Sequence, residues 1–438
     1  MEDVSPNRAS MVRRIALGSA LIASLLACQR SSPTARDHDR RTSPPSAAKP
    51  ANDGGPLGLD ATLAACREHA RLPCDVREEA CQRELFEVVQ CLRGSRDAER
   101  PPLRFVSEAV SRRHREERRA EQHAAQASLE RAAAALGLAS DAGGPRADGV
   151  GPNAYYAPLE RVVYFVASDA VSYESELAAF VVGHEYVHAL QDRHGALAGV
   201  VGSREKRTFD EELAVWSLLE GEATLLEEIL RGLVNGRDVR TWVPARFASR
   251  TAGSDEAITR QRRPLEASFA TFPYTYGAHW AAAEWLAGNA PVADAASRRL
   301  STRDILARRH GWPIADPPCS DKGPEALVTG ERRHGREALG AWLVQAYVRR
   351  RARDAAAARA AAMKSRGDWL AFYSRGQNGD SSFIWRTCWD SETTALEMRS
   401  MIEAQLRETS SESVTVTTEG PHVIAGVHTR ASGTTRPK

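Results

Sequence analysis

Apolar residues recur at helical spacing in two stretches in the middle of the chain, residues 177–190 and residues 213–230. Each stretch predicts a long helix that buries one face. Thr208 and Glu211 stand just before the second stretch in the spacing of a capping box, which marks a helix start. Gly195 follows the first stretch, where a glycine commonly ends a helix.

Strand patterns flank these helices. Residues 154–166 are rich in aromatic and β-branched side chains around a proline turn and predict a strand pair. The last part of the chain predicts a small α+β region, with strands at 382–389, 414–418 and 423–427 and a helix at 392–407. Two further stretches rich in Arg and Ala, residues 98–137 and 337–363, predict helices, of which the first has a solvated face.

The predicted fold class is therefore α+β with a predominance of helix. The boundaries that we expect are a helical, cysteine-rich region over 59–138, a central domain over 150–335 and a C-terminal α+β region over 336–438. The formal net charge of +2 implies no strong attraction to nucleic acid, and we expect no nucleic-acid partner.

The first 28 residues have the pattern of an export signal. A basic start is followed by a short apolar run, residues 15–27, which is too short to span a bilayer comfortably. The sequence up to Cys28 resembles a bacterial lipobox, which implies lipidation of Cys28 and a membrane anchor; the alternative is an ordinary cleaved signal. By the same resemblance, Gln29 favours outer-membrane sorting. Residues 29–58, rich in Ser, Pro, Arg, Ala and Gly, predict a disordered tether.

The cysteines predict disulfides. Seven cysteines less Cys28 leave six, an even number that suits an oxidising compartment. Four of them flank a predicted helical hairpin that turns near Pro73, and an antiparallel hairpin allows nested pairs. The expected disulfides are Cys66–Cys91, Cys74–Cys81 and Cys319–Cys388. The alternative, a zinc site made by the first four, lacks the C-x-x-C pairs that such sites use.

The first central helix carries a His-Glu-x-x-His pattern formed by His184, Glu185 and His188. Histidines four residues apart leave the same face of a helix, and their spacing suits one tetrahedral Zn²⁺. Glu185 stands beside them, where a carboxylate can take a proton from water. The alternative is a solvated helix face with two incidental histidines.

A third ligand is needed, and the residues alone leave candidates open. His194 has the metzincin spacing, but Gln191 stands where those enzymes have glycine. No methionine occurs between Met11 and Met363 to form a Met-turn, so His194 is expected to face solvent. Glu220 and Glu222 lie within the second apolar helix, where a carboxylate needs a cation or a hydrogen-bond partner. Periodicity does not decide between them.

Two motifs, residues 184–192 (HEYVHALQD) and residues 220–223 (EGEA), resemble the gluzincin metallopeptidases, and in particular secreted bacterial and archaeal members. The resemblance implies a zincin-like catalytic domain with a small edge sheet, a Zn²⁺ cofactor and a protein or peptide substrate. It makes Glu220 the third ligand and Glu185 the general base. Thermolysin has an Asp one turn after its ligand Glu, where this chain has Thr224, so Glu222 or Asp192 is left to contact the zinc histidines.

Other parts of a peptidase cleft have weaker signals. Residues 161–166 are a candidate for the edge strand that binds extended substrate, or else a purely structural edge. Tyr274, Tyr276 or His279 could stabilise the oxyanion of a tetrahedral intermediate, with a packed aromatic turn as the alternative.

The sequence thus predicts an exported, lipid-anchored zinc peptidase. Two alternatives stay open: a non-catalytic envelope lipoprotein with a structural zinc site, and a zinc amidase that acts on peptidoglycan.

Overall fold

The structure is a computed structural model, and part of the chain is described in it. The described residues are 59–70, 72–95, 98–120, 129–130, 132–138, 153–167, 171–193, 197, 207–260, 264–288, 300–310, 332–349, 355–375, 380–409 and 413–428. All of them belong to one compact unit; a second unit, residues 1–56 and 147–151, lies outside them. The predicted export signal, Cys28 and the whole tether over 29–58 lie outside them too.

A disulfide-bonded helical hairpin begins the described part. Helix α2 (Leu59–Arg67) and helix α3 (Glu79–Arg93) are joined by Cys66–Cys91, and Cys74–Cys81 ties the connection to α3. Both predicted pairs are confirmed. Because disulfides persist in oxidising compartments, they indicate a protein that resides outside the cytoplasm.

A three-stranded sheet follows the hairpin. Its order is β1-β3-β2, with β1 (Leu103–Ser107) parallel to β3 (Val162–Ala167) and β2 (Ala154–Ala157) antiparallel to β3. The predicted strand pair is confirmed as β2 and β3. Two expectations need correction: β1 interrupts the helix expected over 98–137, since prolines at 101 and 102 favour extended backbone, and the helix α4 (Glu108–Ala120) starts only afterwards. Residues 162–166 of the expected edge strand belong to the central strand β3, so the edge strand near the site is β2 instead.

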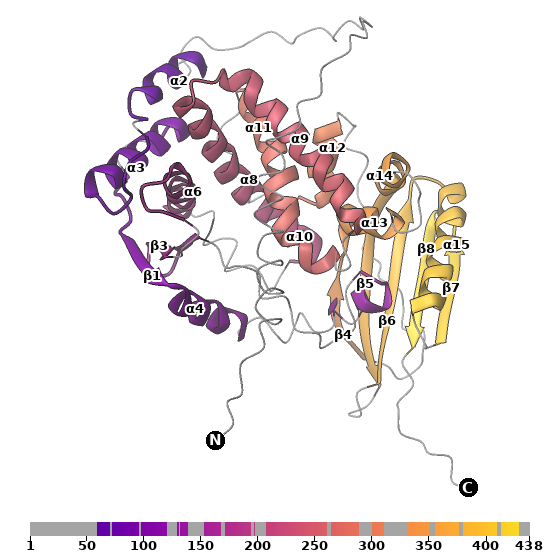
Figure 1. Ribbon diagram of the computed structural model, residues 1–438. Helices are drawn as coiled ribbons and strands as arrows, with labels where there is room; N and C mark the ends of the chain where they lie inside the picture. Colours follow the sequence, from indigo (N-terminus) through magenta and orange to yellow (C-terminus); the bar gives the residue numbers. More distant parts are fainter. Residues whose placement is uncertain are drawn as a thin grey trace, which may run out of the picture. The chain divides into compact units, whose positions relative to one another are not determined.

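The helical core surrounds the two helices predicted in the middle of the chain (Figure 1). Helix α6 (Glu176–Arg193) packs against β2, β3, α3 and helix α8 (Phe209–Val234). The capping box at the start of α8 is confirmed, since Thr208 accepts from the Glu211 N–H and the Glu211 carboxylate accepts from the Thr208 N–H. The other elements that pack here are α9 (Val239–Arg260), α10 (Pro264–Phe272), the π-helix η2 (Pro273–Gly277), α11 (Ala278–Leu286) and α12 (Thr302–His310).

The C-terminal region is α+β, as predicted. A five-stranded antiparallel sheet has the order β4-β5-β6-β8-β7. Its strands are β4 (Arg332–Glu337), β5 (Ser365–Arg375), β6 (Asp380–Trp389), β7 (Ser413–Glu419) and β8 (His422–His428), and its helices are α13 (Gly340–Arg349), α14 (Ala355–Lys364) and α15 (Glu392–Thr409). The single helix expected over 337–363 is therefore two helices that follow β4. Cys388 is disulfide-bonded, while its expected partner Cys319 lies outside the described residues.

No helix within the described residues has the length and apolar character that crossing a membrane requires.

Acids cluster where the C-terminal region meets the start of α8, and Glu337 accepts a hydrogen bond there from the N–H of Phe209. Asp210 accepts hydrogen bonds from the N–H and hydroxyl of Thr302, while Asp368 accepts from the N–H groups of Leu339 and Gly340. Burial raises the pKa of Asp210 to about 7 and that of Glu337 to about 7. The native state therefore binds more protons than the unfolded chain between the ordinary carboxyl pKa and pH 7.

This excess of bound protons predicts a pH effect with a definite sign. The contribution of Asp210 to the free energy of unfolding should fall as the pH rises from about 4 to about 7, by roughly 1.4 kcal/mol per pH unit at most. Urea unfolding of the Asp210→Asn variant should show a smaller fall over that window than the wild type. Equal pH slopes in the two proteins would contradict the assignment.

Candidate metal centre

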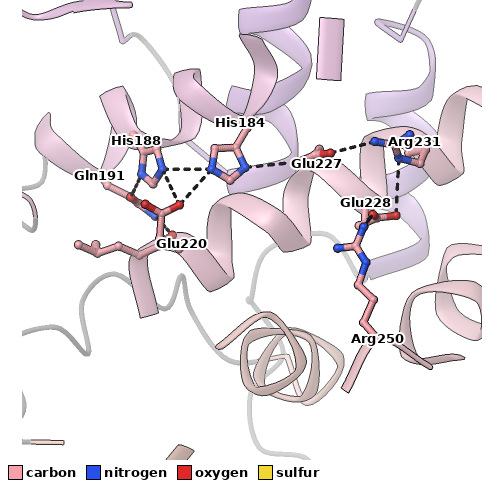
Figure 2. A network of polar contacts seen from close by, with 9 residues as sticks. His184, His188, Gln191, Glu220, Glu227, Glu228, Arg231 and Arg250 are labelled. Atoms are coloured by element: carbon pink, nitrogen blue, oxygen red, sulfur yellow. Dashed lines mark hydrogen bonds and ion pairs between the residues drawn. The ribbon is translucent and has the colours of Figure 1, made fainter. Parts of the chain in front are cut away.

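Three side chains from α6 and α8 converge on one point (Figure 2). His184 and His188 lie one turn apart on α6, and their Nε2 atoms are 3.2 Å from each other. Each Nε2 is also 3.2 Å from Oε2 of Glu220 on α8. The structure thus brings together the three residues predicted as metal ligands.

The triangle of donor atoms fits a zinc ion. Zinc bonds of 2.0–2.2 Å in a tetrahedral site place the donor atoms about 3.3 Å apart, close to the 3.2 Å observed for all three pairs. Two histidines and one carboxylate are also the ligand set of catalytic zinc sites that keep a fourth position open. The histidines are 8% and 7% exposed, so the donors are shielded yet reachable.

Gln191 orients His188. Its Nε2 donates to the carbonyl of Leu219 and to Oε2 of Glu222, both at 2.9 Å, and its Oε1 lies 2.8 Å from Nδ1 of His188. Because both amide hydrogens are used, Oε1 must accept the bond from His188. Nδ1 therefore carries the proton and Nε2 presents its lone pair to the centre of the site.

Glu227 orients His184 in the same way. Its Oε2 lies 3.3 Å from Nδ1 of His184, and its Oε1 accepts from Arg231 at 2.9 Å. Burial favours a raised pKa for Glu227, but the hydrogen bond to His184 and the charges of Arg231 and Arg250 outweigh burial and lower the pKa. The carboxylate is therefore ionised and accepts the Nδ1 proton.

The expectation that Glu222 or Asp192 would contact the histidines needs correction. Glu222 contacts Gln191 instead, and Asp192 accepts from the hydroxyl of Tyr156 at 3.0 Å. Sequence reasoning missed Gln191 and Glu227 as partners. Their spacing could have indicated them. Gln191 lies one turn after His188, and Glu227 lies two turns after Glu220 on the same side of α8.

Glu185 faces the edge of the small sheet. Its Oε2 accepts from the backbone N–H of Tyr156 in β2 at 2.7 Å, and the residue is 8% exposed. Burial raises the pKa of Glu185, although the neighbouring histidines oppose this. A higher pKa makes the carboxylate a stronger base, and the hydrogen bond fixes it between the ligand pair and β2.

The two tyrosines of η2 have different places. Tyr274 stacks beside the His184 ring at a centroid distance of 6.2 Å, and its hydroxyl is hydrogen-bonded to Glu220. Tyr274 is 37% exposed as a whole residue, but desolvation at its hydroxyl, together with the charges of Glu220 and Glu185, raises the pKa of Tyr274 well above its usual value, so the hydroxyl is a neutral donor. Tyr276 is fully buried against Phe272 and Trp342, and the expectation that it belongs to the site needs correction.

Two glycines let η2 approach α8. A Cβ on Gly221 would lie 2.4 Å from the carbonyl carbon of Gly277, and a Cβ on Gly277 would lie 2.2 Å from the carbonyl oxygen of Ser217. Only glycine permits this contact, which places Tyr274 over Glu220. The close packing of η2 against α8 thus explains why the EGEA motif has a glycine at position 221. π-Helical turns of this kind are frequent at functional sites.

Two candidates from the sequence are not among the converging ligands of the described residues. His194 lies outside the described residues, and His279 is half-buried on α11. Comparisons with protein-family models, curated proteins and solved structures found no match to this chain.

Proposed function

We propose that the protein is a zinc-dependent peptidase of gluzincin type. The observation that carries the proposal is the triangle formed by His184, His188 and Glu220, with a buried carboxylate, Glu185, on the next residue of the same helix. Zinc held by these residues would supply Lewis acidity to a peptide carbonyl and to water.

The chain's own residues then supply the proton transfers. Glu185 takes a proton from the attacking water and passes it to the leaving amine, as a raised carboxyl pKa favours. Tyr274, whose neutral hydroxyl donates to Glu220 in the structure, would turn that single O–H to the oxygen on which negative charge develops. The candidate strand for pairing with an extended peptide is β2, the edge strand whose Tyr156 N–H contacts Glu185.

The location that we propose follows from the N-terminal pattern. The protein is exported, lipidated at Cys28 and sorted to the outer membrane, and the tether over 29–58 holds the catalytic region away from the lipid. The protein would then contact the membrane only through the lipid on Cys28.

A structural zinc site is the weaker alternative. Such sites close four positions with Cys or His, whereas the group found among the described residues has three members, one of them a carboxylate. An amidase acting on peptidoglycan would use the same centre. Assays with protein and with peptidoglycan substrates distinguish the two activities.

Metal removal and ligand substitution test the proposal. The purified protein should hold one zinc ion, hydrolyse unfolded protein substrates, lose this activity to a chelator and regain it with Zn²⁺. His184→Ala and Glu220→Ala should weaken zinc binding by more than the 10–100-fold that loss of an outer partner costs, because each removes a ligand. The exposed His69→Ala is the matched control. Zinc retained in Glu220→Ala at wild-type affinity would refute the site.

A further inference from the structure

A buried polar path leads from His188 to the disulfide-bonded hairpin. His188 contacts Oε1 of Gln191, whose Nε2 donates to Oε2 of Glu222. The other carboxylate oxygen of Glu222, Oε1, accepts from Nε of Arg93 at 3.1 Å. The path therefore crosses from α6 to α8 and ends on α3.

Both charged members of this path are removed from water. The side chains of Arg93 and Glu222 are 2% and 5% exposed. A buried carboxylate is stable only when its oxygens are paired, and Glu222 uses one oxygen for each partner. Arg93 thus fixes the carboxylate, and the carboxylate, together with the carbonyl of Leu219, fixes the rotation of the Gln191 amide.

The rotation of that amide decides what His188 can do. In the observed orientation Oε1 faces Nδ1, so the proton resides on Nδ1 and Nε2 is free to bind a metal. The opposite rotation would turn an N–H toward Nδ1 and move the imidazole proton to Nε2, which would block ligation. The orientation therefore depends on the two acceptors of the Gln191 amide, the carboxylate of Glu222 and the carbonyl of Leu219.

The position of Arg93 ties this dependence to the hairpin. Arg93 is the last residue of α3 and follows Cys91, which is bonded to Cys66, by two positions. Gly94 ends the helix in the left-handed conformation, with its N–H bonded to the carbonyl of Cys91. Helix α3 contacts both α6 and α8.

We propose that Arg93 is a positioning residue of the metal centre, acting on His188 through Glu222 and Gln191. The hairpin over residues 59–93 is thus a permanent part of the centre and not a removable lid. This inference rests on the zinc site proposed above, but it adds a residue from outside the two ligand helices.

The test is a titration of metal-free full-length protein with Co²⁺, whose visible spectrum reports the ligand geometry, followed by competition with Zn²⁺. Arg93→Met should raise the Kd for both ions by about tenfold, as loss of an outer partner of a metal ligand does, and should change the Co²⁺ spectrum. Arg93→Lys, which keeps a cationic donor, should recover part of the affinity.

A matched control comes from Arg100, which follows the hairpin and contacts it. Arg100 donates to Gln82 and Glu79 of α3 and to the hydroxyl of Tyr186 on α6, and no hydrogen bond or ion pair within the described part of the chain joins it to Glu222. Arg100→Met therefore removes a contact between the hairpin and α6 and should leave the Kd and the Co²⁺ spectrum at wild-type values.

A second variant serves if Arg93→Met does not fold. Glu222→Gln keeps the size of the side chain but offers one acceptor where the path needs two, so it should also weaken metal binding by about tenfold. In the double variant the losses should not add, because both changes break the same path. Circular dichroism checks the fold of each variant.

The outcomes separate this inference from the proposed function. Folded Arg93→Met or Glu222→Gln protein with wild-type Kd and spectrum overturns the inference, provided that His188→Ala abolishes binding. If His188→Ala binds Co²⁺ as the wild type does, the proposed zinc site itself fails, and the inference with it.

Discussion

Replacing Glu185 by Gln should abolish peptide hydrolysis and leave zinc binding intact. The amide oxygen can still accept the hydrogen bond from the Tyr156 N–H, so the side chain should stay in place. An amide cannot take a proton from water, and loss of a general base costs about 10²–10⁴ in rate. We expect kcat to fall by about 10³-fold, with the zinc content at one ion per chain.

The control for Glu185→Gln is a second carboxylate on α6 that faces away from the site. Glu176, an exposed residue in the first turn of α6, meets this requirement, and Glu176→Gln should keep the wild-type kcat. Full activity in Glu185→Gln would remove the general base from the mechanism, whatever the metal content.

Replacing Gly221 by Ala should damage both the fold and the site. The new Cβ would lie 2.4 Å from the carbonyl carbon of Gly277 and 2.9 Å from the nitrogen of Ala278, and these are backbone atoms that cannot rotate away. Separating α8 from η2 should lower the free energy of unfolding by about 3 kcal/mol, which exceeds the gain of about 1 kcal/mol from the helix propensity of alanine. Chemical denaturation measures the net loss.

The same separation should reduce activity in the fraction that still folds, because Tyr274 would move away from Glu220. The control is Gly253→Ala in α9, where a Cβ meets nothing within 4 Å. This change should stabilise the protein by up to about 1 kcal/mol. If Gly221→Ala were as stable as Gly253→Ala, the close approach of the two helices would be wrong.

The ligand triangle could be anticipated because its geometry is largely local. His184 and His188 lie on one face of a helix at any packing angle, so their spacing alone places two donors together. Glu220 could not be distinguished from Glu222 by periodicity, and the resemblance to gluzincins selected it. The two disulfides of the hairpin followed from its antiparallel geometry.

The hydrogen-bond partners of the two histidines could not be predicted from spacing along one helix. Whether Glu222 or Glu227 reaches an imidazole depends on how α6 and α8 cross, and spacing along one helix does not give that angle. Tyr274 and Tyr276 were equivalent in the sequence. The π-helical turn, held by Gly221 and Gly277, sends one to the site and the other into the core.

Strand β1 was missed for a related reason. Its five residues carry an exposed Arg104 and a partly exposed Phe105, and their burial pattern does not alternate clearly. Pairing with β3 makes this segment a strand, and that partner lies about 60 residues further along the chain. Long-range pairing of a short strand leaves little trace in local sequence.

The most direct test of the central claim is anomalous diffraction at the zinc edge from crystals of the zinc-loaded protein. The account predicts one peak within about 2.2 Å of Nε2 of His184, Nε2 of His188 and a carboxylate oxygen of Glu220. A zinc ion held elsewhere, or one bound to the two histidines with His194 in place of Glu220, would contradict it.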